Sequence, residues 1–90
     1  MRDKKVIYTA AVRAYGEKAQ EDVAIEEFAE LIQAICHKHR GRANNIAEEI
    51  ADCEIMLEQL KTINLCEQEV ENIKKEKIAR LERRVYDEIL

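Results

Sequence analysis

Proline is absent from this chain of 90 residues, glycine occurs only as Gly16 and Gly41, and aromatic residues make up 4 % of it. The common residues are instead Ala, Ile, Leu, Glu, Lys and Arg, which favour helices over strands. No apolar run approaches the roughly 18 residues that a membrane span needs, and 47 % hydrophobic residues are too many for a disordered chain. We therefore expect one all-α domain over residues 1–90, with no membrane segment.

The three cysteines, Cys36, Cys53 and Cys66, are odd in number and show no CxxC spacing. Reduced thiols in a cytosolic protein are the simplest interpretation. Residues 1–16 contain no continuous apolar core, so we expect no signal peptide and a cytoplasmic location. The net charge of −4 argues against nonspecific binding of nucleic acid.

The spacing of apolar residues predicts four helices, at about residues 3–15, 18–39, 45–63 and 66–89. Gly16 and Gly41 suit the ends of the first two. The break near residues 62–65 is weakly signalled, so the third and fourth helices could be partly continuous. The short turn at residues 40–44 predicts that the second and third helices form an antiparallel hairpin.

Apolar stripes run along both helices of this hairpin, and we expect them to face the core. They comprise Ala24, Phe28, Leu31, Ile32 and Ile35 on the second helix, and Ile46, Ile50, Cys53 and Leu57 on the third. Asn45, with Glu48 three residues later, fits a capping box at the start of the third helix.

Two pairs of acidic residues border these stripes: Glu27 and Glu30 on the second helix, Glu49 and Asp52 on the third. A separation of three residues places the members of a pair about 60° apart, on one side of the helix. No basic residue lies four positions before or after Glu49 or Asp52. We expect all four carboxylates to face the other helix of the hairpin or another subunit.

Four clustered carboxylates repel one another, and each is costly to remove from water. A hard divalent cation resolves this conflict, and an oxygen-only ligand set fits Mg²⁺ or Mn²⁺ better than zinc. The alternative is a pair of solvated helix faces, which are common in a chain with 19 acidic residues. Zinc at Cys36, His37 and His39 is not expected, because their spacing matches no zinc-ligand pattern.

The two motifs, Glu27-Phe28-Ala29-Glu30 and Glu49-Ile50-Ala51-Asp52, come in order on consecutive helices with 18 residues between them. In this respect the chain resembles the MazG-like all-α nucleoside triphosphate pyrophosphohydrolases, most closely the small single-domain proteins of phage and bacteria. The likeness covers about residues 15–61, and residues 76–85 more loosely. It departs at Tyr15, where the family commonly has Trp before glycine.

The resemblance implies a four-helix bundle-like fold built on a central antiparallel hairpin and completed by oligomerisation, as a homodimer or homotetramer. It implies Mg²⁺, or Mn²⁺, held by Glu27, Glu30, Glu49 and Asp52. The implied reaction is hydrolysis of a nucleoside or deoxynucleoside triphosphate between its α and β phosphates, giving the monophosphate and pyrophosphate.

Further roles follow from that reaction. Glu26 is the nearest spare carboxylate to activate a water, or it is an exposed helix acid. Tyr15 stacks on the base or packs in the bundle. A basic stripe on the fourth helix, Lys77, Arg80 and Arg84, binds phosphate or forms surface ion pairs with neighbouring acids. The rival hypothesis is a non-catalytic interaction or oligomerisation protein that keeps the acidic frame.

Overall fold

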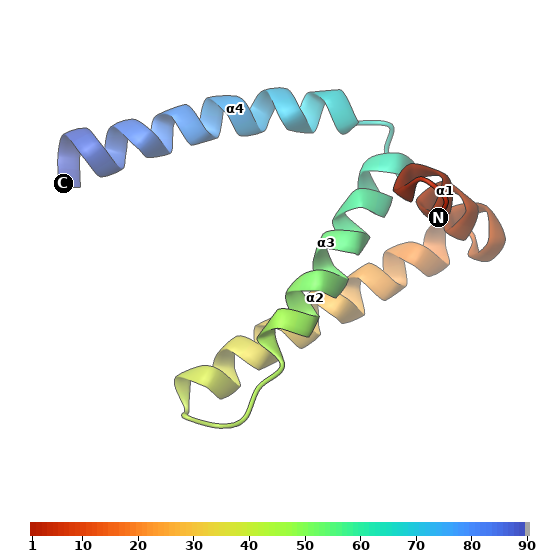
Figure 1. Ribbon diagram of the computed structural model, residues 1–90, viewed down its shortest axis with the longest axis horizontal. Coiled ribbons are helices and arrows are strands. Elements are labelled where there is room, and N and C mark those ends of the chain that lie inside the picture. Colours follow the sequence, from red (N-terminus) through yellow and green to blue (C-terminus); the bar gives the residue numbers. More distant parts are fainter. Residues whose placement is uncertain (90) are drawn as a thin grey trace.

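The computed structural model describes residues 1–89, and the regular structure in this part of the chain is all helical, with no strand. Its elements are α1 (Lys4–Tyr15), α2 (Glu17–His39), α3 (Ile46–Ile63) and α4 (Glu67–Arg83), followed by a π-helical end at Arg84–Ile89. α2 and α3 form an antiparallel hairpin, α1 packs across its open end, and α4 projects away (Figure 1). The all-α class and the hairpin are therefore confirmed. Over the described residues, no helix has the length and apolar character to cross a bilayer.

A single residue, Gly16, separates α1 from α2. Its N–H donates to the carbonyl oxygen of Val12 at 2.8 Å, and its φ of 94° lies in a region that L side chains rarely adopt. The chain can therefore turn sharply here and lay α1 against both helices of the hairpin. Gly41, with a φ of 69°, ends the α2 segment in the same way, as predicted.

The predicted capping box at the start of α3 is wrong. Asn45 makes no side-chain bond to the first turn, whose Ile46 N–H donates instead to Asn44 Oδ1 at 3.3 Å. The Asn45 amide donates to the Glu49 carboxylate at 2.7 Å, and this bond occupies the side chain that would have capped the helix.

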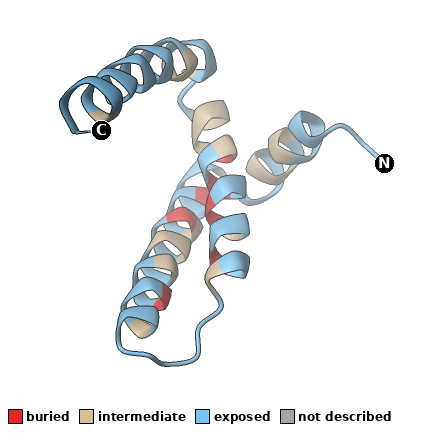
Figure 2. Ribbon diagram, turned by 60° about the vertical axis from the view of Figure 1, so that its left-hand side comes forward, coloured by how far each residue is buried: buried red, intermediate tan, exposed pale blue. Residues whose placement is uncertain are grey.

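The buried residues gather along the seam between α2 and α3 (Figure 2), and most of them are small or polar. Its buried members are Gln20, Ala24 and Ala34 on α2 and Glu49, Cys53, Met56 and Gln59 on α3. Most follow the alternating three- and four-residue spacing of a coiled-coil seam. The helices come close enough for the Cys53 thiol to donate to the Glu27 carbonyl oxygen at 3.3 Å.

The apolar stripes predicted to face the core are only partly buried. Ile32 on α2 is 63 % exposed, and Ile50 and Leu57 on α3 are 43 % and 50 % exposed. The reason is geometric, because two helices packed along one seam each bury a single narrow strip. Small and polar residues, together with Met56, occupy that strip, and the branched apolar residues are left on its flank.

α4 leaves the hairpin after a turn in which Leu65 adopts a φ of 52°, so the alternative of a continuous α3–α4 helix is wrong. It contacts α3 only near this turn, where Lys5 on α1 also pairs with Glu67 at 2.8 Å. The radius of gyration is 16.3 Å, compared with about 12 Å for a compact domain of this length. Within one chain, α4 therefore does not complete a four-helix bundle.

Candidate metal centre

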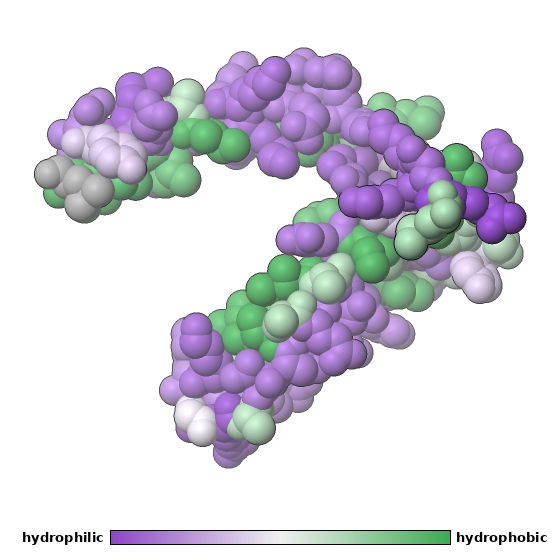
Figure 3. Space-filling view, in the orientation of Figure 1, coloured by the Kyte–Doolittle hydropathy of each residue, from purple (hydrophilic) through white to green (hydrophobic). Residues whose placement is uncertain are grey.

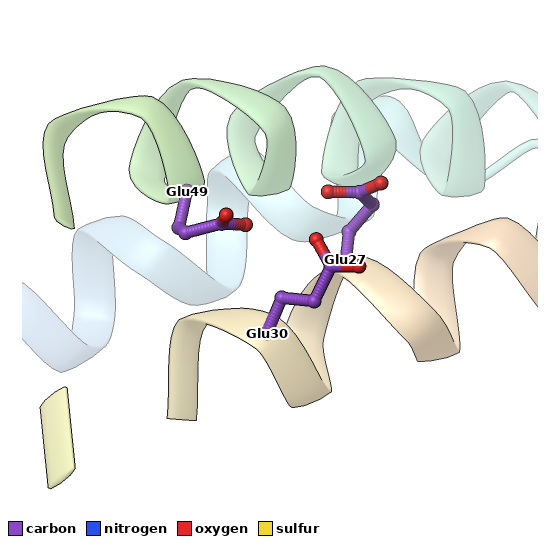
Figure 4. A group of neighbouring side chains, drawn as sticks. All are labelled: Glu27, Glu30 and Glu49. Atoms are coloured by element: carbon purple, nitrogen blue, oxygen red, sulfur yellow. The ribbon is translucent and has the colours of Figure 1, made fainter. Parts of the chain in front are cut away.

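Three carboxylates converge in the middle of the hairpin (Figure 4). Glu27 and Glu30 extend from α2 and Glu49 extends from α3, and each contributes an oxygen to a group whose members all lie within 4.8 Å of one another. Oxygens at this separation are close enough for one cation to lie among them, since Mg²⁺ and Mn²⁺ bind oxygen ligands at short distances.

Local helix geometry explains why these side chains meet. Glu27 and Glu30 are one turn apart on the same side of α2. Glu49 occupies a seam position of α3, so it must point towards α2. Ala34 and Cys53 keep the two backbones close, which lets carboxylates from both helices reach the same space.

Two of these carboxylates carry oxygens that have no partner. Glu49 is only 6 % exposed, and while its Oε1 accepts from Asn45, its Oε2 is buried without a hydrogen bond. Glu27 Oε2 is likewise buried and unpaired. None of the ion pairs formed by residues 1–89 involves either side chain. Buried polar atoms are normally satisfied, so this pair of oxygens calls for a ligand.

Burial and mutual repulsion both act on the protonation of the cluster. Burial raises the pKa of the Glu27 carboxyl, and the nearby charges of Glu30 and Asp52 raise it further. Burial is also the main cause that raises the pKa of Glu49; the hydrogen bond from Asn45 opposes it and the charge of Glu30 adds to it. The cluster therefore holds its negative charge only at a cost, which a cation would remove.

Asp52, the fourth predicted ligand, lies at the border of the group. It is half-buried on α3 and close enough to Glu27 to raise that residue's pKa, but it is not part of the tight group of three. The structure thus brings Glu27, Glu30 and Glu49 together and places Asp52 beside them.

The other predicted site residues lie apart from this group. Glu26 is exposed on α2, and Tyr15, at the end of α1, is 71 % exposed. The three basic residues, Lys77, Arg80 and Arg84, are exposed on the helix that projects away from the hairpin. Their roles stay predictions, because within one chain the basic stripe does not reach the cluster.

The positions of two polar residues were missed from the sequence, those of Asn45 beside Glu49 and of Gln59 further along the α3 seam. Asn45 orients Glu49 through its hydrogen bond to the carboxylate. The four-residue separation of the two side chains, which places them on one face of the helix, could have predicted this contact. Gln59 is 6 % exposed with its Oε1 unpaired, and no sequence feature marked it as buried.

Comparison of the chain with family models, with curated proteins and with solved structures found no significant match.

Proposed function

We propose that this protein is a Mg²⁺-dependent nucleotide pyrophosphohydrolase, which cleaves a nucleoside or deoxynucleoside triphosphate to the monophosphate and pyrophosphate. The observation that carries the proposal is the convergence of Glu27, Glu30 and Glu49, with two buried oxygens left unpaired. The resemblance of the ExxE and ExxD motifs to the MazG-like enzymes supports the same reaction.

The donor set fits the proposed ion. The proposed ligands in the group of three are all carboxylate oxygens, with no His or Cys among them. Such a ligand set favours Mg²⁺ or Mn²⁺ over metals that prefer nitrogen or sulfur ligands. Glu27, Glu30 and Glu49 would hold the ion, with Asp52 next to them. When bound, Mg²⁺ supplies charge neutralisation for the phosphates and a bound water of lowered pKa.

The protein's own residues would do the rest. Asn45 holds the Glu49 carboxylate in place through its 2.7 Å bond. Glu26, one residue before the first ligand, is the proposed acceptor for a proton of the attacking water. Lys77, Arg80 and Arg84 are the proposed phosphate contacts, and Tyr15 the proposed base contact. Since α4 points away from its own hairpin, these cations would come from a second copy in a homodimer or homotetramer.

The test is a panel of nucleoside and deoxynucleoside triphosphates incubated with Mg²⁺, with release of pyrophosphate as the readout. The proposal expects pyrophosphate from at least one nucleotide and its loss in Glu49→Gln. Glu48→Gln is the matched control, because Glu48 is the adjacent acid on α3 but is exposed. Release that is equal in both variants would refute the assigned site.

The rival hypothesis is a non-catalytic interaction or oligomerisation protein that retains the same acidic residues, Glu27, Glu30, Glu49 and Asp52. Neither of the two described surface pockets is lined by Glu27, Glu30 or Glu49, which is the observation in its favour. Absence of pyrophosphate release from every nucleotide, together with binding of Mg²⁺, would support it.

A further inference from the structure

The single chain exposes more surface than a compact protein of its size. Its accessible area is 7361 Å², whereas a compact monomer of 10.5 kDa exposes about 5,400 Å². The excess is therefore about 1,900 Å² per chain, or about 3,800 Å² for two chains, which is in the range of total area that obligate interfaces bury. No large side chain is fully buried in residues 1–89, so the core of the single chain is small and made mainly of Ala24, Ala34, Cys53 and Met56.

Part of this area is an apolar flank of the hairpin. Ile25, Phe28 and Ile32 recur at three- and four-residue spacing on α2, and Ile50 and Leu57 recur at seven on α3. In an antiparallel hairpin these positions fall on the same side of the seam, opposite to the side that holds Glu30 and Asp52. Ile25 and Ile32 are 67 % and 63 % exposed, so this apolar flank has no cover within the chain.

α4 carries a second uncovered apolar stripe. Ile73, Ile78 and Leu81 are 42 %, 59 % and 53 % exposed, although they lie on one broad side of the helix. In the space-filling view, apolar atoms gather on the side of α4 that faces the hairpin and on the hairpin edge that faces α4, with an open notch between them (Figure 3). The two surfaces face each other but do not meet in one molecule.

Charge indicates which surfaces of two copies would meet. α2 and α3 together carry eleven acidic and three basic residues, a net charge of −8. Residues 74–84, which run from the C-terminal part of α4 into the π-helical end, carry six basic and two acidic residues, a net charge of +4. Two hairpins brought face to face would oppose like charges. A hairpin and residues 74–84 of another copy have complementary charge, which favours that pairing.

We propose that two copies of this chain exchange α4, so that the apolar stripe of α4 from each copy lies on the apolar flank of the other copy's hairpin. The occupant of the flank is thus a second copy and not a different protein. The exchange would supply the interface of the dimer in the proposed function, and none of the apolar residues that form this interface is a proposed metal ligand.

Leu81→Glu tests the proposal by placing a charge in the apolar stripe of α4, and Ile32→Glu does the same on the apolar flank of the hairpin. Wild-type protein at micromolar concentration should sediment with twice the chain mass of 10.5 kDa. Each variant breaks both copies of the interface and should raise the dimer dissociation constant at least about 100-fold. Ala79→Glu is the control, because residue 79 lies on the opposite side of α4 and the substitution should leave the dimer intact.

Mixing the two variants separates exchange from other dimers. A Leu81→Glu chain has an unaltered hairpin, and an Ile32→Glu chain has an unaltered α4. A mixed dimer therefore contains one complete interface, so the mixture should form dimers that neither variant forms alone. A Leu81→Glu protein that stays dimeric would overturn the exchange in favour of hairpin-to-hairpin packing. A monomeric wild type would also overturn it, while leaving stabilisation by Mg²⁺ as a separate test of the metal centre.

Discussion

Neutralising Glu49 should remove most of the stabilisation of this protein by Mg²⁺. The Glu49 side chain is 6 % exposed, has one unpaired oxygen and lies within 4.8 Å of two other carboxylates. In the wild type, Mg²⁺ at 100 times its dissociation constant should add about 2.7 kcal/mol to the free energy of unfolding. For a domain of this length, that gain corresponds to a rise in Tm of roughly 10–20 °C.

Glu49→Gln keeps the shape of the side chain and an oxygen that can accept from Asn45, but it removes one charge from the cluster. The metal-free variant should therefore be more stable than metal-free wild type at neutral pH, because burial opposes the ionised form of Glu49. It should also lose most of the stabilisation by Mg²⁺. Thermal unfolding followed by circular dichroism, with and without Mg²⁺ at matched ionic strength, measures both effects.

Glu48→Gln is again the matched control, because it removes the same charge from an exposed position one residue away. It should keep the full response to Mg²⁺. If Glu49→Gln and Glu48→Gln respond to Mg²⁺ like the wild type, or if the wild type shows no response at all, the reasoning from the unpaired oxygens is wrong.

Three further predictions concern stability. Met56→Ala should lower the free energy of unfolding by about 2–5 kcal/mol, because Met56 is only 5 % exposed in the seam. Urea unfolding measures this loss, and a loss below about 1 kcal/mol would contradict the packing described for Met56. Metal-free protein should lose stability as the pH rises above 4.5, the ordinary pKa of a glutamate. The raised pKa values of Glu27 and Glu49 make the folded state bind more protons than the unfolded state. A stability that instead rises with pH, in both the wild type and Glu49→Gln, would exclude this cause. Lys5→Ala should leave the midpoint of urea unfolding almost unchanged, since the paired side chains of Lys5 and Glu67 are 74 % and 55 % exposed. A clear fall in the midpoint would mean that this pair positions α4.

The helix boundaries were predictable because local signals set them. Gly16 and Gly41 both adopt positive φ and end their helices, and the four predicted starts lie within one residue of those observed. The last turn of α4 differs, since it is π-helical from Arg84 to Ile89. The convergence of Glu27 with Glu30 was equally local, because a three-residue separation needs no knowledge of the rest of the fold.

What could not be predicted depends on competition between distant or neighbouring groups. The apolar stripes were broad, and a helical wheel does not show that the small residues Ala34 and Cys53 take the seam while Ile32 and Leu57 stay outside. Asn45 had two possible partners, the first turn of α3 and the Glu49 carboxylate, and the charged acceptor gives the stronger hydrogen bond. The direction of α4 depends on the turn at Leu65, which carries no glycine to mark it.

The contact of the Cys53 thiol with the main chain of Glu27 also has a consequence for ion size. At that point the gap between the two helices is as narrow as a sulfur atom permits, so the backbones themselves limit how far apart opposing oxygens can stand. Mg²⁺ binds oxygen at about 2.0–2.1 Å and Ca²⁺ at about 2.3–2.6 Å. A branched side chain in place of the Cys53 thiol would increase the distance between α2 and α3. At the proposed centre it would therefore shift the preference from Mg²⁺ towards Ca²⁺ without altering any ligand.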